Sequence, residues 1–204
     1  LSLHDALPIS SLAPPPPSHV LAIKSPDSDR TLLLPVHGIV WAARSAGLSI
    51  LSSHPSSQPP SPRLPREPPP SPSHLPVIEL TLPSSLAVPL IQGWVYLTSP
   101  SLLLQSLLPK LPPPPTTSLA PLLNPAEPPV HNATTLAEGL SALPSKVLMD
   151  RVHLVHGMWQ DVVALEMADQ ELWDTMGRAW AILVAALALG EKRRSARLSA
   201  ESQG

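Results

Sequence analysis

The sequence predicts an α+β protein that is mostly helical, with long Pro/Ser-rich segments between its ordered pieces. Short apolar runs bounded by prolines predict strands. Apolar residues at helical spacing in the last third of the chain predict helices. Proline accounts for 30 of the 204 residues, against an ordinary usage of roughly 5%. Because proline fixes φ and lacks an N–H donor, such segments cannot propagate a helix or a sheet. We therefore expect ordered regions at 30–110 and 133–190, separated by disordered linkers.

The first nine residues, "LSLHDALPI", resemble a translated sequencing adapter. The alternatives are a fragment that starts here by chance and the apolar part of a signal peptide. A signal peptide has a basic segment before an uninterrupted apolar run of about 7–15 residues. Here no Lys or Arg comes first, and His4, Asp5 and Pro8 interrupt the run. We therefore set residues 1–9 aside and treat the chain as a fragment, which leaves an upstream domain or targeting signal open.

Residues 10–29 are predicted to be a disordered linker that opens with polyproline II structure. A short strand is expected at 31–34, after which Pro35 suits the first turn of a helix. Apolar side chains follow at helical spacing, at Val36, Ile39, Val40 and Ala43, and Gly47 is a natural end. The Pro/Ser-rich stretch 52–74 is interpreted as a disordered insertion. Its "PPSPRLPREPPP" could bind a Pro-recognising domain, but its composition favours an inert spacer.

After the insertion, Pro76 and Pro83 enclose a strand in "LPVIELTLP", with alternate residues on opposite faces. A helix follows, with Ser84 or Ser85 as its N-cap and Pro89 in its first turn. Its apolar positions are Leu86, Leu90, Trp94 and Leu97. A second short helix is expected in "SLLLQSLLPKL". Residues 111–132 form a Pro-rich linker.

The C-terminal region 133–190 has the clearest pattern. Thr135 and Glu138 stand at capping-box spacing at the start of a first helix. A long helix follows with an apolar stripe at Val147, Leu148, Val152, Val155, Trp159, Val162, Val163 and Met167. Asp169 can cap the last helix, and Gly190 is expected to end it. The apolar face of this last helix is predicted at Leu172, Trp173, Met176, Trp180, Leu183, Val184 and Leu187. Residues 191–204 are then a polar tail.

The composition bounds the chemistry. A net charge of −2 gives no electrostatic basis for binding nucleic acid. The lack of cysteine excludes disulfides and thiolate zinc sites. His153 and His156 are spaced to share a metal on a helix, but paired histidines of this kind are more often solvated, so we assign no metal site. Because no nucleophile, phosphate-loop or dinucleotide motif occurs, we assign no catalytic or cofactor-binding residue and expect a non-enzyme.

The apolar run "AWAILVAALALG" at 179–190 is followed by Lys192, Arg193 and Arg194. One interpretation is a membrane anchor with a basic flank. A membrane span needs about 20 apolar residues, and a run of about 10–14 is more often a buried helix. We therefore favour a packed helix over an anchor.

Two stretches carry a family resemblance. "TLLLPVHGIVWAARSAGL" and "VIELTLPSSLAVPLIQGWVYLTSP" resemble the strand–helix units of BTB/POZ domains, in a degenerate form without Phe and split by the Pro-rich insertion. "VHGMWQDVVALEMADQELWDTMGRAWAILVAAL" is similar to the C-terminal helical region of fungal clampless-type proteins, with its two Trp-bearing helices. The resemblance implies a regulator of clamp-cell and dikaryon development in basidiomycetes that acts through protein–protein contacts and carries no catalytic residue.

The prediction from sequence is thus a non-catalytic protein-interaction module, intracellular in the nucleus or cytoplasm, without a cofactor. Its partners are expected to be proteins, including further copies of itself, rather than nucleic acid or membrane. Bulky aromatic side chains dominate both cores and interfaces, so we single out four tryptophans as core or interface anchors: Trp94, Trp159, Trp173 and Trp180. The alternatives are a membrane-associated protein held by 179–190, or a largely disordered Pro-rich chain with one helical hairpin.

Overall fold

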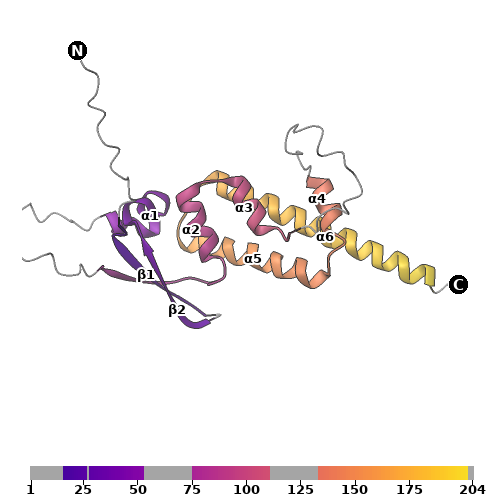
Figure 1. The fold of residues 1–204 in the computed structure, drawn as a ribbon, viewed down its shortest axis with the longest axis horizontal. Coiled ribbons are helices and arrows are strands. Elements are labelled where there is room, and N and C mark those ends of the chain that lie inside the picture. The colour runs from indigo at the N-terminus through magenta and orange to yellow at the C-terminus, as the bar shows by residue number, and fades with distance from the viewer. Residues whose placement is uncertain (1–15, 27, 53–74, 111–132, 202–204) are drawn as a thin grey trace, which may run out of the picture.

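The computed structural model describes residues 16–26, 28–52, 75–110 and 133–201 (Figure 1). In chain order its elements are β1 (His19–Ser25), β2 (Ser28–Val36), α1 (Gly38–Arg44), the 3₁₀ helix η1 (Ala46–Ser52), β3 (Val77–Thr81), α2 (Val88–Leu97), α3 (Pro100–Leu107), α4 (Ala133–Leu140), α5 (Ser145–Ala164) and α6 (Gln170–Glu201). The described chain is mostly helical with one small sheet, which confirms the predicted α+β class.

The sheet has the order β2-β1-β3, with β1 antiparallel to β2 and parallel to β3. Its central strand β1 lies inside 10–29, so the prediction of a linker is wrong for this part. The four prolines at 14–17 dominated that prediction, but the five residues His19–Ile23 are free of proline and rich in apolar side chains. Leu21 and Ile23 are buried, and β1 bonds to a strand on each side. Residues 10–15 lie outside the described residues.

Pro35 lies in β2 and does not open a helix. It pairs with Val20, and the edge position of β2 tolerates a residue without an N–H. Helix α1 begins later, after His37, and its buried residues are Gly38 and Trp41. Ile39, which the spacing placed with Val36 on one helical face, is 75% exposed. The expected face was wrong because Val36 belongs to the strand.

The strand between Pro76 and Pro83 is confirmed as β3, with Ile78 and Leu80 on its half-buried face. Pro89 is in the first turn of α2 as predicted, but the N-cap is Ala87 and not a serine. Ser84 instead donates its backbone N–H to Asp161 Oδ1 on α5, at 2.8 Å. The predicted face of α2 is also shifted: Leu86 and Leu97 are exposed, while Val88, Ile91, Trp94 and Val95 are buried.

In the C-terminal region, α4 begins at Ala133, so Thr135 lies inside the helix and the predicted capping box is wrong. The long helix α5 is confirmed, although Val147 and Val163 at the margins of its stripe are exposed. Helix α6 does not end at Gly190 but continues to Glu201. The residues after Gly190 are mostly Glu, Lys, Arg, Ala and Leu, which have high helix propensity, so the predicted tail is helical. The linkers at 53–74 and 111–132 lie outside the described residues.

The sheet with α1 stands at one end of the molecule, and α6 runs along the helical part to project at the other end (Figure 1). Helices α3, α4 and α5 pack against α6, and α2 contacts α1, α3 and α5. Buried apolar side chains from the sheet, α1, α2 and the C-terminal helices form a single cluster. The described residues therefore share one core, which is more than the helical hairpin of the third alternative.

Two glycines inside long helices provide a test of this packing. A Cβ at Gly157 of α5 would lie 2.9 Å from the Cβ of Ser84, whereas at Gly177 of α6 it would meet no described atom within 4 Å. We predict that Gly157→Ala lowers the free energy of unfolding by about 1–3 kcal/mol through overpacking. The matched Gly177→Ala should raise it by about 0.5–1 kcal/mol through helix propensity. Urea unfolding measures both, and equal changes would contradict the close contact of α5 with Ser84.

Candidate interaction surface

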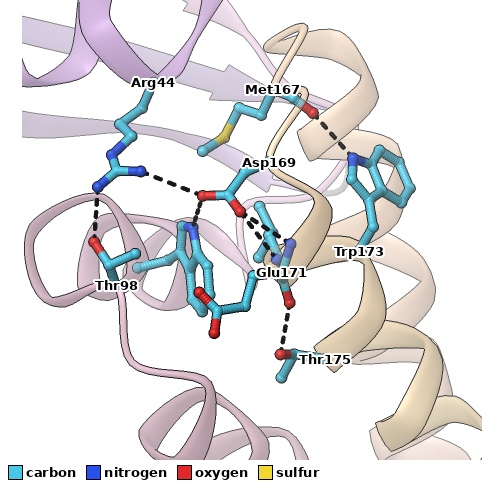
Figure 2. Close-up of polar contacts among 9 residues, drawn as sticks. Arg44, Thr98, Met167, Asp169, Glu171, Trp173 and Thr175 are labelled. Atoms are coloured by element: carbon cyan, nitrogen blue, oxygen red, sulfur yellow. Dashed lines mark hydrogen bonds and ion pairs between the residues drawn. The ribbon is translucent and has the colours of Figure 1, made fainter.

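Asp169, just before α6, brings three parts of the fold together (Figure 2). Its Oδ1 accepts the backbone N–H groups of Glu171 at 3.1 Å and Leu172 at 3.3 Å, which confirms the predicted cap of α6. Its Oδ2 accepts the indole N–H of Trp94 from α2 at 3.1 Å and lies 3.4 Å from Arg44 Nη1 of α1. One carboxylate thus fixes the start of α6 against both α1 and α2.

Arg44 extends this joint to the end of α2. Its Nη2 donates to Thr98 Oγ1 at 2.9 Å. Thr98 is the C-cap of α2 and has a φ of 45°, a left-handed conformation that costs energy in a residue with a branched Cβ. The guanidinium therefore helps to hold a strained turn and also lies beside the Asp169 carboxylate.

Further polar contacts join the N-terminal elements to the end of α5. The Ser45 hydroxyl donates to the carbonyl oxygen of Leu165. The backbone N–H of Ala46 donates to the carbonyl oxygen of Glu166 at 3.4 Å. Glu166 has a φ of 52°. Gly47 lies against this turn, because a Cβ there would be 3.3 Å from Leu165 O. The small residue at 47 allows η1 and the α5–α6 turn to approach closely.

The predicted anchors take different positions. Trp94 is buried, with its N–H on Asp169. Trp173 is half-buried and donates to the carbonyl of Met167 at 3.0 Å. Trp159 of α5 and Trp180 of α6 are half-buried and stack with ring centroids 5.4 Å apart and an interplanar angle of 19°. All four contact the core, and none is a free exposed aromatic.

Trp41 is 1% exposed, although the sequence did not single it out as an anchor. It lies on the inner face of α1, a helix of only seven residues, which is too short for periodicity to mark its buried side. The indole N–H of Trp41, like that of Trp159, has no hydrogen-bond partner among the described residues. In the sequence, the large apolar side chain of Trp41 was the only indication that this residue is buried.

An open apolar groove lies between α2 and α3. Its lining contains no charged residue and consists of Pro89, Leu90, Gly93, Trp94, Leu97, Ser99, Leu102, Leu103 and Ser106. Leu97 is 63% exposed and Leu102 is 49% exposed at its rim. A Cβ at Gly93 would meet no described atom within 4 Å, so the floor of the groove is open at this point. We call these nine residues the α2/α3 groove.

The histidine pair on α5 is exposed at both positions, His153 and His156. Within the described ranges, no group of three or more His, Asp or Glu side chains is placed to hold a metal ion.

The exposed ion pair between Lys24 and Glu79, at 2.7 Å, links β1 to β3. The hydrogen bond and charge of Lys24 lower the pKa of Glu79. This ion pair, like the contacts of Asp169 and Ser45, joins one element of the fold to another.

Comparison with protein families identifies the chain. The model of the Clampless protein 1 C-terminal domain matches residues 101–203, about half of the chain. The chain belongs to the Clampless protein 1 family. The model of the Clampless protein 1 N-terminal domain matches residues 2–83. This second match includes residues 2–9, whose origin in an adapter stays a prediction.

Two curated family members are similar to this chain. Clampless protein 1 of Cryptococcus neoformans var. neoformans serotype D is 30% identical over 117 residues in strain JEC21 and, equally, in strain B-3501A. The match covers 56% of this chain and 21% of each relative, so the chain spans about a fifth of their length. No solved structure matches the chain.

The Asp169 joint predicts a specific pattern of stability. Asp169→Ala should lower the free energy of unfolding by about 2–4 kcal/mol, because it removes a helix cap worth about 1 kcal/mol and leaves the buried indole N–H of Trp94 without its acceptor, which costs about 1–3 kcal/mol. Asp169→Asn keeps an acceptor for the cap and should lose less. The control Asp174→Ala alters an exposed carboxylate of the same helix, which accepts a hydrogen bond from Gln170, and should change stability by about 0.5 kcal/mol or less. Thermal unfolding checks this, and equal losses at 169 and 174 would contradict the joint.

Proposed function

We propose that this chain is a non-catalytic protein-interaction module of a fungal developmental protein that acts in clamp-cell and dikaryon formation. Membership of the Clampless protein 1 family supports the developmental role. The α2/α3 groove supports the mode of action, because an open apolar surface without charge suits a protein segment more than a polar metabolite. We propose an intracellular site of action, in the nucleus or cytoplasm.

The non-catalytic role is supported by how the molecule uses its polar side chains. Asp169, Arg44 and Ser45 are engaged in joints between elements. The BTB/POZ-like interpretation of residues 30–110 remains part of the proposal. It is supported by the repeated order of strand then helix, β2–α1 and β3–α2.

The partner surface is proposed to be an apolar helix or strand that inserts side chains between Leu97 and Leu102. Apolar anchors that enter a groove dominate the energy of such interfaces. A further copy of this chain is one form that this partner can take. The half-buried tryptophans of α5 and α6 pack against the same core that contains Trp94 of the groove.

Membrane association is the second candidate, because one described helix, α6, is long and apolar enough to cross a bilayer by length and composition alone. Several apolar residues of that helix are buried in the core, among them Ala179, Ile182, Leu183 and Ala186. Extraction of fungal membranes with alkaline carbonate separates the candidates: an inserted helix stays with the lipid, and a peripheral or soluble chain is released.

The groove provides a direct test in mating fungal cells. Leu97→Asp places a charge at the rim, and Gly93→Leu adds a bulky side chain at a groove position where a Cβ would meet no described atom within 4 Å. Both should reduce the yield of the groove's crosslinked protein partner by about tenfold or more, since hot-spot losses exceed about 1.4 kcal/mol. Ile50→Asp, at an equally exposed apolar residue on η1, is the matched control and should retain the partner.

Sedimentation of the purified chain establishes first whether that partner is a second copy. Thermal unfolding of each variant separates loss of binding from loss of fold. The proposal is wrong if folded groove variants retain every crosslink of the wild type and support normal clamp cells.

A further inference from the structure

Gly190 marks the place where α6 crosses the turn between α4 and α5. The residue is buried, and a Cβ there would lie 3.1 Å from the carbonyl oxygen of Ser141. The 141–144 turn is therefore in contact with the helix at this point. A contact this close between a helix and a backbone carbonyl determines which side of α6 faces the turn for the residues that follow.

Arg193, Arg194 and Arg197 lie three, four and seven residues beyond Gly190, so they project from the same side of the helix. Before Gly190 this side is apolar and buried, at Ala179, Leu183 and Ala186. After Gly190 the three arginines take its place. They line a pocket together with Ser141, Ala142, Leu143, Pro144 and Gly190, which we call the arginine pocket.

The positive charge in the arginine pocket exceeds the negative charge around it. Residues 191–200 contain four basic residues and one acidic residue. That acid, Glu191, lies 2.6 Å from Arg194, and Lys146 at the start of α5 is paired with Asp150. Arg193 and Arg197 have no carboxylate partner in the part of the chain that the structure describes. Among the side chains that the structure describes, these two guanidinium groups are thus left to bind an external anion.

The start of α5 adds to this field. The 20-residue helix begins at Ser145, and its N-cap Pro144 supplies no side-chain acceptor. The first backbone N–H groups of a helix lack partners within the helix, and its N-terminus carries a partial positive charge. Pro144 lines the arginine pocket, so three arginines face the positive end of a helix. The pocket therefore has a positive field that attracts an anion.

We propose that the arginine pocket binds a phosphate monoester group. A phosphate monoester carries close to two negative charges and three terminal oxygens, and each guanidinium can bind two acceptors in parallel. This charge matches the two available arginines better than a single carboxylate does. The five other lining residues are all small or apolar, so none of them adds a negative charge that would compete with such a group. Its source is either a free small molecule or the headgroup of a lipid.

The test uses the full 204-residue chain and probes that separate these two sources. Inorganic phosphate, followed by ³¹P NMR, represents the free anion. Phosphatidylcholine vesicles that carry a minority of phosphatidic acid, a phosphate monoester lipid, represent the headgroup, in a sedimentation assay. Vesicles with phosphatidylserine at equal charge density carry a phosphodiester and control for general attraction to an anionic surface.

Arg193→Gln and Arg197→Gln should each weaken binding of the effective probe by about tenfold, the usual effect of losing a charge-assisted hydrogen bond. Lys192→Gln is the matched control, since it makes the same change of charge one residue away without lining the pocket. It should weaken binding by no more than about twofold, as expected of a screened charge. All three residues are exposed, so their replacement leaves the core intact.

Every outcome decides the proposal. Pocket-dependent binding of inorganic phosphate supports a free ligand, and pocket-dependent binding of phosphatidic acid vesicles alone supports a headgroup. The proposal is overturned if neither probe binds, if phosphatidylserine vesicles bind as well as phosphatidic acid vesicles, or if Lys192→Gln loses as much binding as Arg193→Gln. None of these results depends on the α2/α3 groove, so the two proposals can fail separately.

Discussion

The Asp169 carboxylate is the constraint on which the arrangement of the described elements depends. It caps α6 through two backbone N–H groups and at the same time accepts the indole N–H of the buried Trp94 and faces Arg44. A buried indole N–H without an acceptor would cost about 1–3 kcal/mol. The start of α6 must therefore lie where Trp94 and Arg44 can both reach it, and this places the longest helix relative to the N-terminal elements.

The remaining polar joints act in the same way. Ser45 bonds to the carbonyl of Leu165, and the fully buried Asp161 accepts the backbone N–H of Ser84. Burial of apolar surface provides most of the energy of such a core, but it is not directional. Hydrogen bonds are directional, and a different alignment of the elements would break these particular pairs and leave their donors and acceptors buried. The apolar cluster therefore stabilises the fold, and these few bonds select how its helices and strands are aligned.

Sequence patterns predicted the long elements. They failed where contacts between residues far apart in the sequence determine whether an element forms or where it ends. The spacing in α5, the prolines that enclose β3 and the cap at Asp169 rest on neighbours within a few residues, and all three are confirmed. Strand β1 was missed because its pairing with β2 and β3 outweighs the prolines before it. The end of α6 was misplaced because Gly190 is required for contact with Ser141 and not for a turn.

The candidate sites, too, were predicted from the sequence only where local patterns determine them. Four tryptophans were evident from the sequence, but the bond from Trp94 to Asp169 joins residues 75 positions apart, and no local pattern encodes it. The α2/α3 groove depends on the angle between two short helices and on the open space at Gly93. Likewise, residues 191–204 were predicted as a polar tail, but only a helix that continues past Gly190 places three arginines beside the start of α5.

The central claim is that Asp169 couples the sheet and α1 to the C-terminal helices in one cooperative unit. Native-state hydrogen exchange of the full chain tests this most directly, because it measures the opening free energy of each amide. We predict that amides of β1 and of the first half of α6 share the same largest opening free energy, and that Asp169→Ala lowers both together. Exchange of β1 at a markedly lower free energy than α6, unaffected by that substitution, would contradict the claim.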